Sequence, residues 1–524
     1  MASQDERIRC SMEPHGDGGM TRRSFLWSAV TGVAAVSLSR GAAAKDTAPK
    51  RSVFDDYDAV GLAELVRKKQ VSPQELLDEA IRRMEAADAH LNAVPIRHYE
   101  EARAQIAAGL PDGPFKGVPF LLKDLNVALK GTLTTGGSRF FRDVRPDYDS
   151  DLVDRCQRAG FVIFGKTASP ELGLTPTTES VLYGATRNPW NLERVAGGSS
   201  GGAGAVVGAR VLPIAQGSDG GGSIRVPASC CGVFGLKTTR GRFPLGPGRQ
   251  EGWNGASVVG ALSLTVRDMA AFVDACAGPI PGASYWAPPA ARPYVQEVAR
   301  APGRLRIALQ RQSGIGTAVD PECVAAVDAA ARLCQSLGHT VEEAAPDLNP
   351  GVLAQAFMAS ISVGALKSVE DRAAVVGRQP TTEDLEAGTW RMVEAGRKVD
   401  GLSYARAREA FDRAAEKMGS FMARYDLILS PTLGQPPVPL GTVNLSPQDL
   451  DAAQLATRTF TPFTAIYNMT GQPAMSVPLH WSADGLPVGV MFAARFGDEA
   501  TLFRLAAQLE RARPWRTRRP PVHA

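Results

Sequence analysis

Two clusters of glycine and serine, joined by a short apolar stretch, dominate residues 197–237. The first cluster reads Gly197-Gly198-Ser199-Ser200-Gly201-Gly202, and the second reads Gly217-Ser218-Asp219-Gly220-Gly221-Gly222-Ser223. Glycine loses more conformational freedom on folding than any other residue, so core packing does not explain this density. Glycine does allow the main chain to approach other groups closely, with N–H groups left free to donate. Serines set among such glycines indicate nucleophilic acyl chemistry.

Helical patterns alternate with short apolar runs along the rest of the chain, which predicts α/β layers. Ser72-Pro73-Gln74-Glu75 combines an N-cap, a first-turn proline and a capping-box glutamate, so a helix is expected from there to about residue 87. Further helices are expected at 59–69, 151–159, 203–209, 264–277, 321–337 and 499–511, with 352–424 mostly helical. Strands are expected at 117–124, 161–164, 211–215, 305–309, 340–342, 425–429 and 486–492.

The N-terminal 44 residues have the pattern of a removable targeting segment. Thr21-Arg22-Arg23-Ser24-Phe25-Leu26 precedes an apolar run, residues 27–38, and then the small tripeptide Ala42-Ala43-Ala44. This order predicts a twin-arginine signal peptide over residues 1–44 and a periplasmic or secreted protein. The apolar run is too short for a stable membrane-spanning helix, so no stable membrane insertion is expected. Residues 45–57 are predicted to be a linker and residues 58–524 a single domain.

Charge and cysteine content exclude several classes of function. The net charge of the 524 residues is +4, without a large basic block, which argues against a nucleic-acid partner. The seven cysteines show no CxxC spacing, and Cys230 and Cys231 are adjacent, so we expect buried free thiols. No metal and no cofactor are expected.

A serine nucleophile needs a base, and the sequence suggests a lysine. None of the six histidines lies between Tyr99 and Gly338. Lysine serves as a base only when burial or nearby positive charge lowers its pKa. Lys123 directly follows Pro119-Phe120-Leu121-Leu122, at the end of an expected buried strand, and is the candidate.

Ser223 is the favoured nucleophile because three glycines precede it. The N–H groups of Gly220, Gly221, Gly222 and Ser223 can turn toward one point and hold a developing oxyanion. Ser199, from the first cluster, is placed as a proton relay between Ser223 and Lys123.

These motifs resemble those of the amidase signature family. The resemblance rests on Gly117-Val118-Pro119 with Lys123-Asp124, both glycine–serine clusters, residues 231–237, residues 425–432 and Gly471-Gln472-Pro473-Ala474. It implies a large mixed β-sheet sandwiched between α-helices, hydrolysis of small-molecule amides, and a Ser-cisSer-Lys triad of Ser223, Ser199 and Lys123. It also implies that Ser200, Ser218, Asp219 and Arg225 support the triad, and it leaves open whether the chain forms a homo-oligomer.

Within this family, the segments 184–192, 239–242 and Pro514-Trp515 resemble the 6-aminohexanoate cyclic-dimer hydrolases. That likeness implies linear or cyclic aliphatic amides as substrates. One departure is Gly220, where many members carry a larger residue, which predicts a looser oxyanion site or a larger pocket.

Two alternatives remain at this point. Gly197-Gly198-Ser199-Ser200-Gly201 also satisfies the nucleophile-elbow pattern of α/β-hydrolases, with Ser199 as nucleophile of an esterase and His339 or His480 as base. The amidotransferase A subunits share the same signature and act with partner proteins on charged tRNA.

Overall fold

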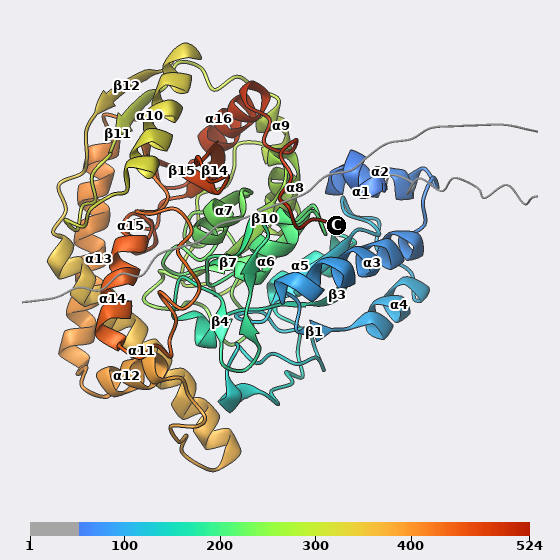
Figure 1. Ribbon diagram of the computed structural model, residues 1–524, viewed down its shortest axis with the longest axis horizontal. Coiled ribbons are helices and arrows are strands. Elements are labelled where there is room, and N and C mark those ends of the chain that lie inside the picture. The colour runs from blue at the N-terminus through green and yellow to red at the C-terminus, as the bar shows by residue number, and fades with distance from the viewer. Residues whose placement is uncertain (1–51) are drawn as a thin grey trace, which may run out of the picture. The chain divides into compact units, whose positions relative to one another are not determined.

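An eight-stranded mixed β-sheet forms the central layer of the structure (Figure 1). In this computed structural model, which describes residues 52–524, strand β11 pairs in parallel with β12 and β13, and the other neighbours are antiparallel. The strand order is β12 (Thr340–Glu343), β11 (Arg306–Leu309), β13 (Leu427–Pro431), β15 (Pro487–Ala494), β14 (Ala474–Trp481), β9 (Phe234–Lys237), β10 (Val258–Ser263) and β8 (Ile214–Asp219). The predicted α/β fold with a mixed sheet is confirmed.

A second, three-stranded sheet carries the strand that ends at Lys123. Its order is β1 (Ile96–Arg97), β3 (Val162–Thr167) and β2 (Pro119–Lys123), with β2 parallel to β3. Strand β2 packs beside β8, at the edge of the large sheet. Two short hairpins complete the strands: β4 (Glu179–Ser180) with β5 (Gly184–Ala185), and β6 (Arg187–Asn188) with β7 (Asn191–Val195).

Several helices begin at residues whose side chains cap them. At the start of α3 (Pro73–Leu91) the Ser72 hydroxyl accepts the Glu75 N–H, and the Glu75 carboxylate accepts the Ser72 N–H, which confirms the capping box. The other helices up to residue 298 are α1 (Val53–Asp56), α2 (Ala59–Arg67), α4 (Tyr99–Ala107), η1 (Arg139–Phe141), α5 (Asp151–Arg158), η2 (Glu171–Gly173), α6 (Gly201–Gly208), α7 (Arg225–Cys231), α8 (Val266–Cys276) and α9 (Tyr294–Val298). The expected signal peptide and most of the expected linker lie outside the described residues.

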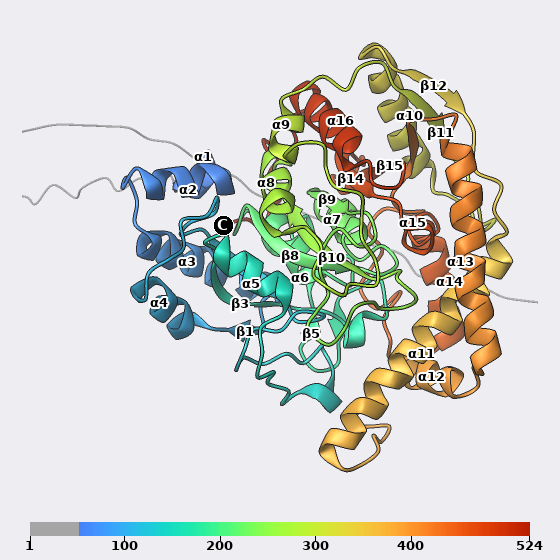
Figure 2. The ribbon, with the colours of Figure 1, turned by 180° about the vertical axis from the view of Figure 1, so that it is seen from behind.

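Three consecutive helices lie together at one side of the described unit, as Figure 2 shows. Helix α11 (Pro350–Val376) packs against α12 (Ala387–Arg397) and α13 (Gly401–Met422). Among residues 52–524, α11 alone is long and apolar enough to cross a membrane by length and composition, a property that core helices share. The remaining helices are α10 (Pro321–Ser336), α14 (Leu450–Phe460), α15 (Ile466–Thr470) and α16 (Glu499–Ala512).

The second glycine–serine cluster begins as a strand, which the sequence did not predict. A strand was expected at 211–215, but β8 covers Ile214–Asp219. Residues from Ile214 to Asp219 pair in register with β10, so Gln216 lies opposite Ala261 and Asp219 opposite Val258. Pairing with a strand some forty residues away overrides the low strand propensity of Gly217 and Asp219.

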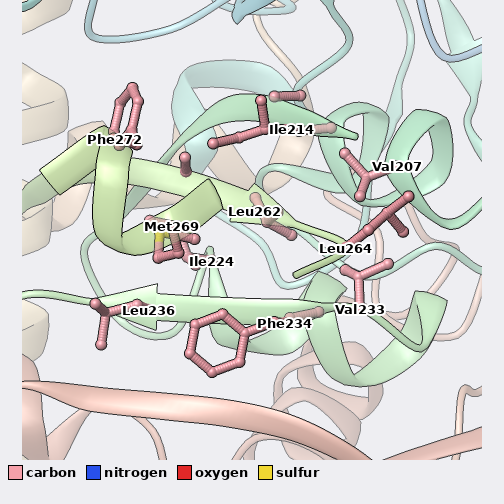
Figure 3. Close-up of a cluster of buried hydrophobic side chains, with 14 of the residues drawn as sticks. Val207, Ile214, Ile224, Val233, Phe234, Leu236, Leu262, Leu264, Met269 and Phe272 are labelled. Carbon is pink, nitrogen blue, oxygen red and sulfur yellow. The ribbon is translucent and has the colours of Figure 1, made fainter. Parts of the chain in front are cut away.

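A buried apolar cluster anchors the glycine-rich block to the rest of the fold. Figure 3 shows side chains from α6, β8, β9, β10, α8 and the turns next to them meeting in this cluster: Val207, Ile214, Ile224, Val233, Phe234, Leu236, Leu262, Leu264, Met269 and Phe272. Ile224 directly follows Ser223, so the position of that serine is tied to the core. The six cysteines among the described residues are free and buried, as expected.

Candidate active site

The Lys123 side chain is fully buried at the end of β2. Its backbone N–H donates to the side-chain oxygen of Gln216 on β8 (2.8 Å), which joins the two sheets at this residue. The Nζ atom donates to the hydroxyl oxygens of Ser199 (2.7 Å) and Ser218 (3.0 Å). Burial lowers the pKa of Lys123 to about 7, and the charge of Asp219 opposes that shift. A large share of the amine is therefore neutral near pH 7.

The Ser200 hydroxyl and backbone hold the two serine clusters together. The Ser200 hydroxyl donates to the Ser218 carbonyl (3.1 Å) and accepts the Ser218 N–H (3.2 Å), and the Ser200 N–H donates to the Ser223 carbonyl (3.2 Å). The peptide bond between Gly198 and Ser199 is cis. Among residues 52–524 the half-buried Ser223 hydroxyl makes no hydrogen bond, so it is free to meet a substrate.

The buried Asp219 carboxylate shapes the loop that carries Ser223. Its Oδ1 accepts the Gly222 N–H (2.8 Å), and its Oδ2 accepts the Ile224 N–H (3.1 Å), so the loop bends around one side chain. The Arg225 guanidinium donates to both oxygens, at 2.9 and 3.0 Å. Although burial by itself raises the pKa of Asp219, the charge and hydrogen bonds of Arg225 outweigh it and lower the pKa to about 2. The conformation of the loop thus depends on a charged Asp219–Arg225 pair.

The N–H groups around Ser223 divide into two kinds. Within the described part of the chain, those of Gly220, Gly221 and Ser223 donate to no protein acceptor, whereas that of Gly222 donates to Asp219. Gly222 was expected to be an oxyanion donor, and its occupied N–H corrects that expectation. Gly222 instead provides a left-handed backbone (φ 138°) that turns the loop beside Thr464.

The space beside Gly220 is filled by the ring of Trp253. A Cβ built on Gly220 would overlap this ring, and one built on Gly364 of α11 would overlap it as well. Trp253 also packs edge-on against Phe357 of α11, with ring centroids 6.4 Å apart. The glycine at position 220 therefore leaves no enlarged pocket, because an indole from the β9–β10 loop occupies the volume that a side chain would take.

Several residues at this site were not found from the sequence. Asn468 of α15 donates to the carboxylate and the carbonyl of Asp219 (both 2.9 Å) and accepts from Arg225 (2.6 Å). Thr464 donates its hydroxyl to the Gly221 carbonyl (2.6 Å). Both come from a segment more than 230 positions away. The only sequence signal was that Asn468 lies three residues before the Gly471-Gln472-Pro473-Ala474 motif.

The histidines that an esterase mechanism would use lie elsewhere. The ring of His339 contacts Gln508 (2.8 Å) and the Leu305 N–H (3.2 Å), and that of His480 contacts Glu322 (2.6 Å). Ser199, the nucleophile of that alternative, instead contacts Lys123.

The chain is similar to known proteins over most of its length. Residues 75–503 match the protein family described as Amidase. The chain belongs to the amidase family. It is accordingly a hydrolase of amide carbon–nitrogen bonds, and the α/β-hydrolase alternative is wrong.

Individual relatives agree with this assignment. A 6-aminohexanoate-cyclic-dimer hydrolase of Paenarthrobacter ureafaciens is 40% identical to this amidase over 477 residues, which cover 89% of this chain and 96% of that enzyme. The solved structure of a 6-aminohexanoate cyclic dimer hydrolase complexed with substrate matches with a TM-score of 0.86 and 38% identity, over 90% of this chain and all of that one. A bacterial aryl acylamidase of the amidase signature family matches with a TM-score of 0.79 and 28% identity, over 88% and 98% of the two chains. The predicted family and the likeness to cyclic-dimer hydrolases are confirmed.

Replacing Asp219 by Asn should destabilise the fold strongly. The change leaves the Arg225 guanidinium buried without its counter-charge, which typically costs about 3–5 kcal/mol of unfolding free energy. Chemical denaturation at pH 7 measures this loss. Asp451→Asn is the matched control, because it breaks an exposed pair with Arg391 and should cost less than about 1 kcal/mol.

The same pair also gives a pH test. Because the folded pKa of Asp219 lies below that of a free carboxyl, its contribution to stability is present above pH of about 4 and is lost as the pH falls toward 2. Asp219→Asn should lack this part of the acid sensitivity. Equal denaturation midpoints for Asp219→Asn and wild type at pH 7 would contradict the role assigned to the pair.

Replacing Gly220 by Ala should displace Trp253. The φ angle of Gly220 lies outside the left-handed region, so the backbone accepts alanine and the effect comes from overlap with the ring. We expect a loss of about 1–3 kcal/mol in stability from overpacking and at least a tenfold loss in kcat/KM. Adding Trp253→Ala should recover most of the stability loss. Gly364→Ala is the control, because its methyl group would overlap the same ring without changing the loop that carries Ser223. Its stability loss should also be recovered by Trp253→Ala, but it should lose less activity than Gly220→Ala.

Proposed function

We propose that this amidase hydrolyses linear or cyclic aliphatic amides through an acyl-enzyme on Ser223, with Ser199 and Lys123 as its proton relay. The observation that carries the proposal is the fully buried Lys123 amine, held 2.7 Å from the Ser199 hydroxyl, with its pKa lowered to about 7. A lysine in that state accepts a proton at neutral pH, which an exposed lysine does not.

In the proposed reaction, the Ser223 oxygen attacks the amide carbonyl carbon. Its proton moves to the Ser199 oxygen while the Ser199 proton moves to Lys123 Nζ. The N–H groups of Gly220, Gly221 and Ser223 stabilise the oxyanion, because they have no other acceptor among the described residues. The carbon–nitrogen bond then breaks, and the relay returns the proton to the leaving amine. Water hydrolyses the acyl-enzyme by the same route.

The substrate class rests on the relatives and on the chemistry of the site walls. The relative at 40% identity is named for a cyclic amide dimer. Trp253 and Phe357 present apolar rings beside Gly220 and Gly221, which suits an aliphatic chain on the substrate.

We also propose export through the twin-arginine route, on the strength of residues 21–44.

A fluorophosphonate probe should modify Ser223. Its hydroxyl is half-buried and makes no hydrogen bond in the described structure, and the proposed relay activates it. Peptide mapping by mass spectrometry identifies the modified residue. Ser223→Ala should block labelling, whereas Ser199→Ala should slow it. Stoichiometric modification of Ser199 in the wild type would contradict the assignment of the nucleophile.

Activity should fall on the acid side of neutrality. Since only neutral Lys123 accepts the proton, kcat/KM should rise as the pH increases and level off above a pKa of about 7. Lys123→Met should lower kcat by roughly a thousandfold or more with the fold intact, as removal of one member of a concerted relay does. Steady-state kinetics between pH 5 and 9 and circular dichroism provide the measurements.

Lys237 is the control for this assignment. It is also fully buried, and burial lowers its pKa to about 7, but its Nζ donates to the Thr238 carbonyl (2.8 Å) instead of a serine. Lys237→Met should therefore keep the same acid limb, even if its activity is reduced. An acid limb that disappears in Lys237→Met and persists in Lys123→Met would refute the proposed base.

A further inference from the structure

Arg249 places a guanidinium beside the polar side of the site, where the proposed mechanism does not use it. Its Nη1 donates to the side-chain oxygen of Asn126 (3.0 Å), and the Asn126 amide donates to the Ser218 hydroxyl (3.4 Å). Ser218 in turn accepts from Lys123 Nζ. Two side chains thus connect Arg249 with the buried lysine, which puts the cation at the rim of the catalytic cluster.

Arg249 has no carboxylate partner among residues 52–524. Its Nε donates to the Glu251 carbonyl (3.1 Å), while the Glu251 side chain interacts with Tyr285. Two of the five guanidinium N–H groups are used, which leaves one on Nη1 and two on Nη2 without an acceptor in the described part of the chain. A guanidinium with free N–H groups on both Nη atoms can donate to both oxygens of a carboxylate.

Arg249 is exposed to solvent and packs against its own loop. Partial burial lowers the pKa of its guanidinium. The Nη2 atom lies against Gly252, where any Cβ would overlap it. Tyr148, 46% exposed, is the other ionisable side chain that acts on the charge of Arg249.

Arg249 and Trp253 belong to the same loop, between β9 and β10. Trp253 contacts the oxyanion loop at Gly220, and Arg249 contacts Asn126 beside Ser218, so one segment meets both ends of the catalytic cluster. A substrate chain that lies along this loop would meet the indole near the scissile carbonyl and the guanidinium farther out.

We propose that Arg249 binds a carboxylate on the substrate, so that this amidase prefers amides whose aliphatic chain ends in a carboxylate. The proposal rests on the amide hydrolysis proposed above. The carboxylate can belong to the acyl part or to the amine part of the amide, and the chemistry of recognition is the same in both cases.

The test compares matched charged and neutral substrates. The acyl-side pair is the mono-p-nitroanilide of adipic acid and hexanoyl-p-nitroanilide. The amine-side pair is N-butyryl-6-aminohexanoate and N-butyrylhexylamine. Wild type should favour the charged member of one pair, and Arg249→Gln should lower kcat/KM for that member by about 10- to 100-fold, mostly through KM. The neutral members should change less than about threefold.

Two further variants test whether the planar guanidinium of Arg249 is responsible for the preference. Arg249→Lys keeps the charge but not the planar edge, so it should recover only part of the loss. Arg413→Gln removes a partly exposed arginine that pairs with Glu409 on α13, and it should leave the charged-to-neutral ratio unchanged. Raising the salt concentration should shrink the wild-type preference and not that of Arg249→Gln.

The outcomes separate the two proposals. If wild type hydrolyses none of these amides, the proposed function fails. If wild type hydrolyses them and Arg249→Gln loses equal activity on charged and neutral members, or on neither, the carboxylate site is refuted. A selective loss on one pair supports the site and identifies the side of the amide that carries the carboxylate.

Discussion

The buried Asp219 carboxylate is the interaction on which the rest of the site depends. A loop of three glycines has no side chains with which to fix its own conformation. The loop is instead bent around Asp219, which accepts the N–H groups of Gly222 and Ile224. That carboxylate could not stay charged in the core without Arg225 and Asn468, because an unpaired buried charge is far too costly. The geometry of the proposed catalytic groups therefore depends on this buried charge pair.

Asp219 also affects the pKa of Lys123. Burial shifts the pKa of Lys123 downward, and the same carboxylate that orders the loop shifts it upward. Arg225 carries the opposite charge directly beside this carboxylate, so it reduces the field that Asp219 exerts on Lys123. The ion pair thus serves two needs at once, the shape of the loop and the neutrality of the amine.

The sequence predicted the parts of the site that depend on local patterns. Glycine density, the lack of nearby histidines and an apolar run ending in lysine led to Ser223, Ser199 and Lys123. Local patterns could not show that the Gly222 N–H is already occupied, because that depends on the exact bend around Asp219. They also could not show that Asn468 or Trp253 reaches the site, because those contacts join segments far apart in the chain. The start of β8 was misplaced for the same reason, since its pairing with β10 decides its limits.

Because local patterns locate the proposed reacting groups but not the residues around them, the reaction is easier to infer from the sequence than the substrate is. The proposed reacting groups lie on β2 and on two glycine–serine segments, which the Ser200 hydroxyl joins by its hydrogen bonds to the backbone of Ser218. The side chains around them come from the β9–β10 loop and α11, which lie next to these groups only in the folded protein. Trp253 occupies the volume beside Gly220 because Gly364 of α11 leaves room on the other side of the ring. A change in either segment can reshape the surroundings of the proposed catalytic cluster without altering Lys123, Ser199 or Ser223, so the same cluster can serve different amides.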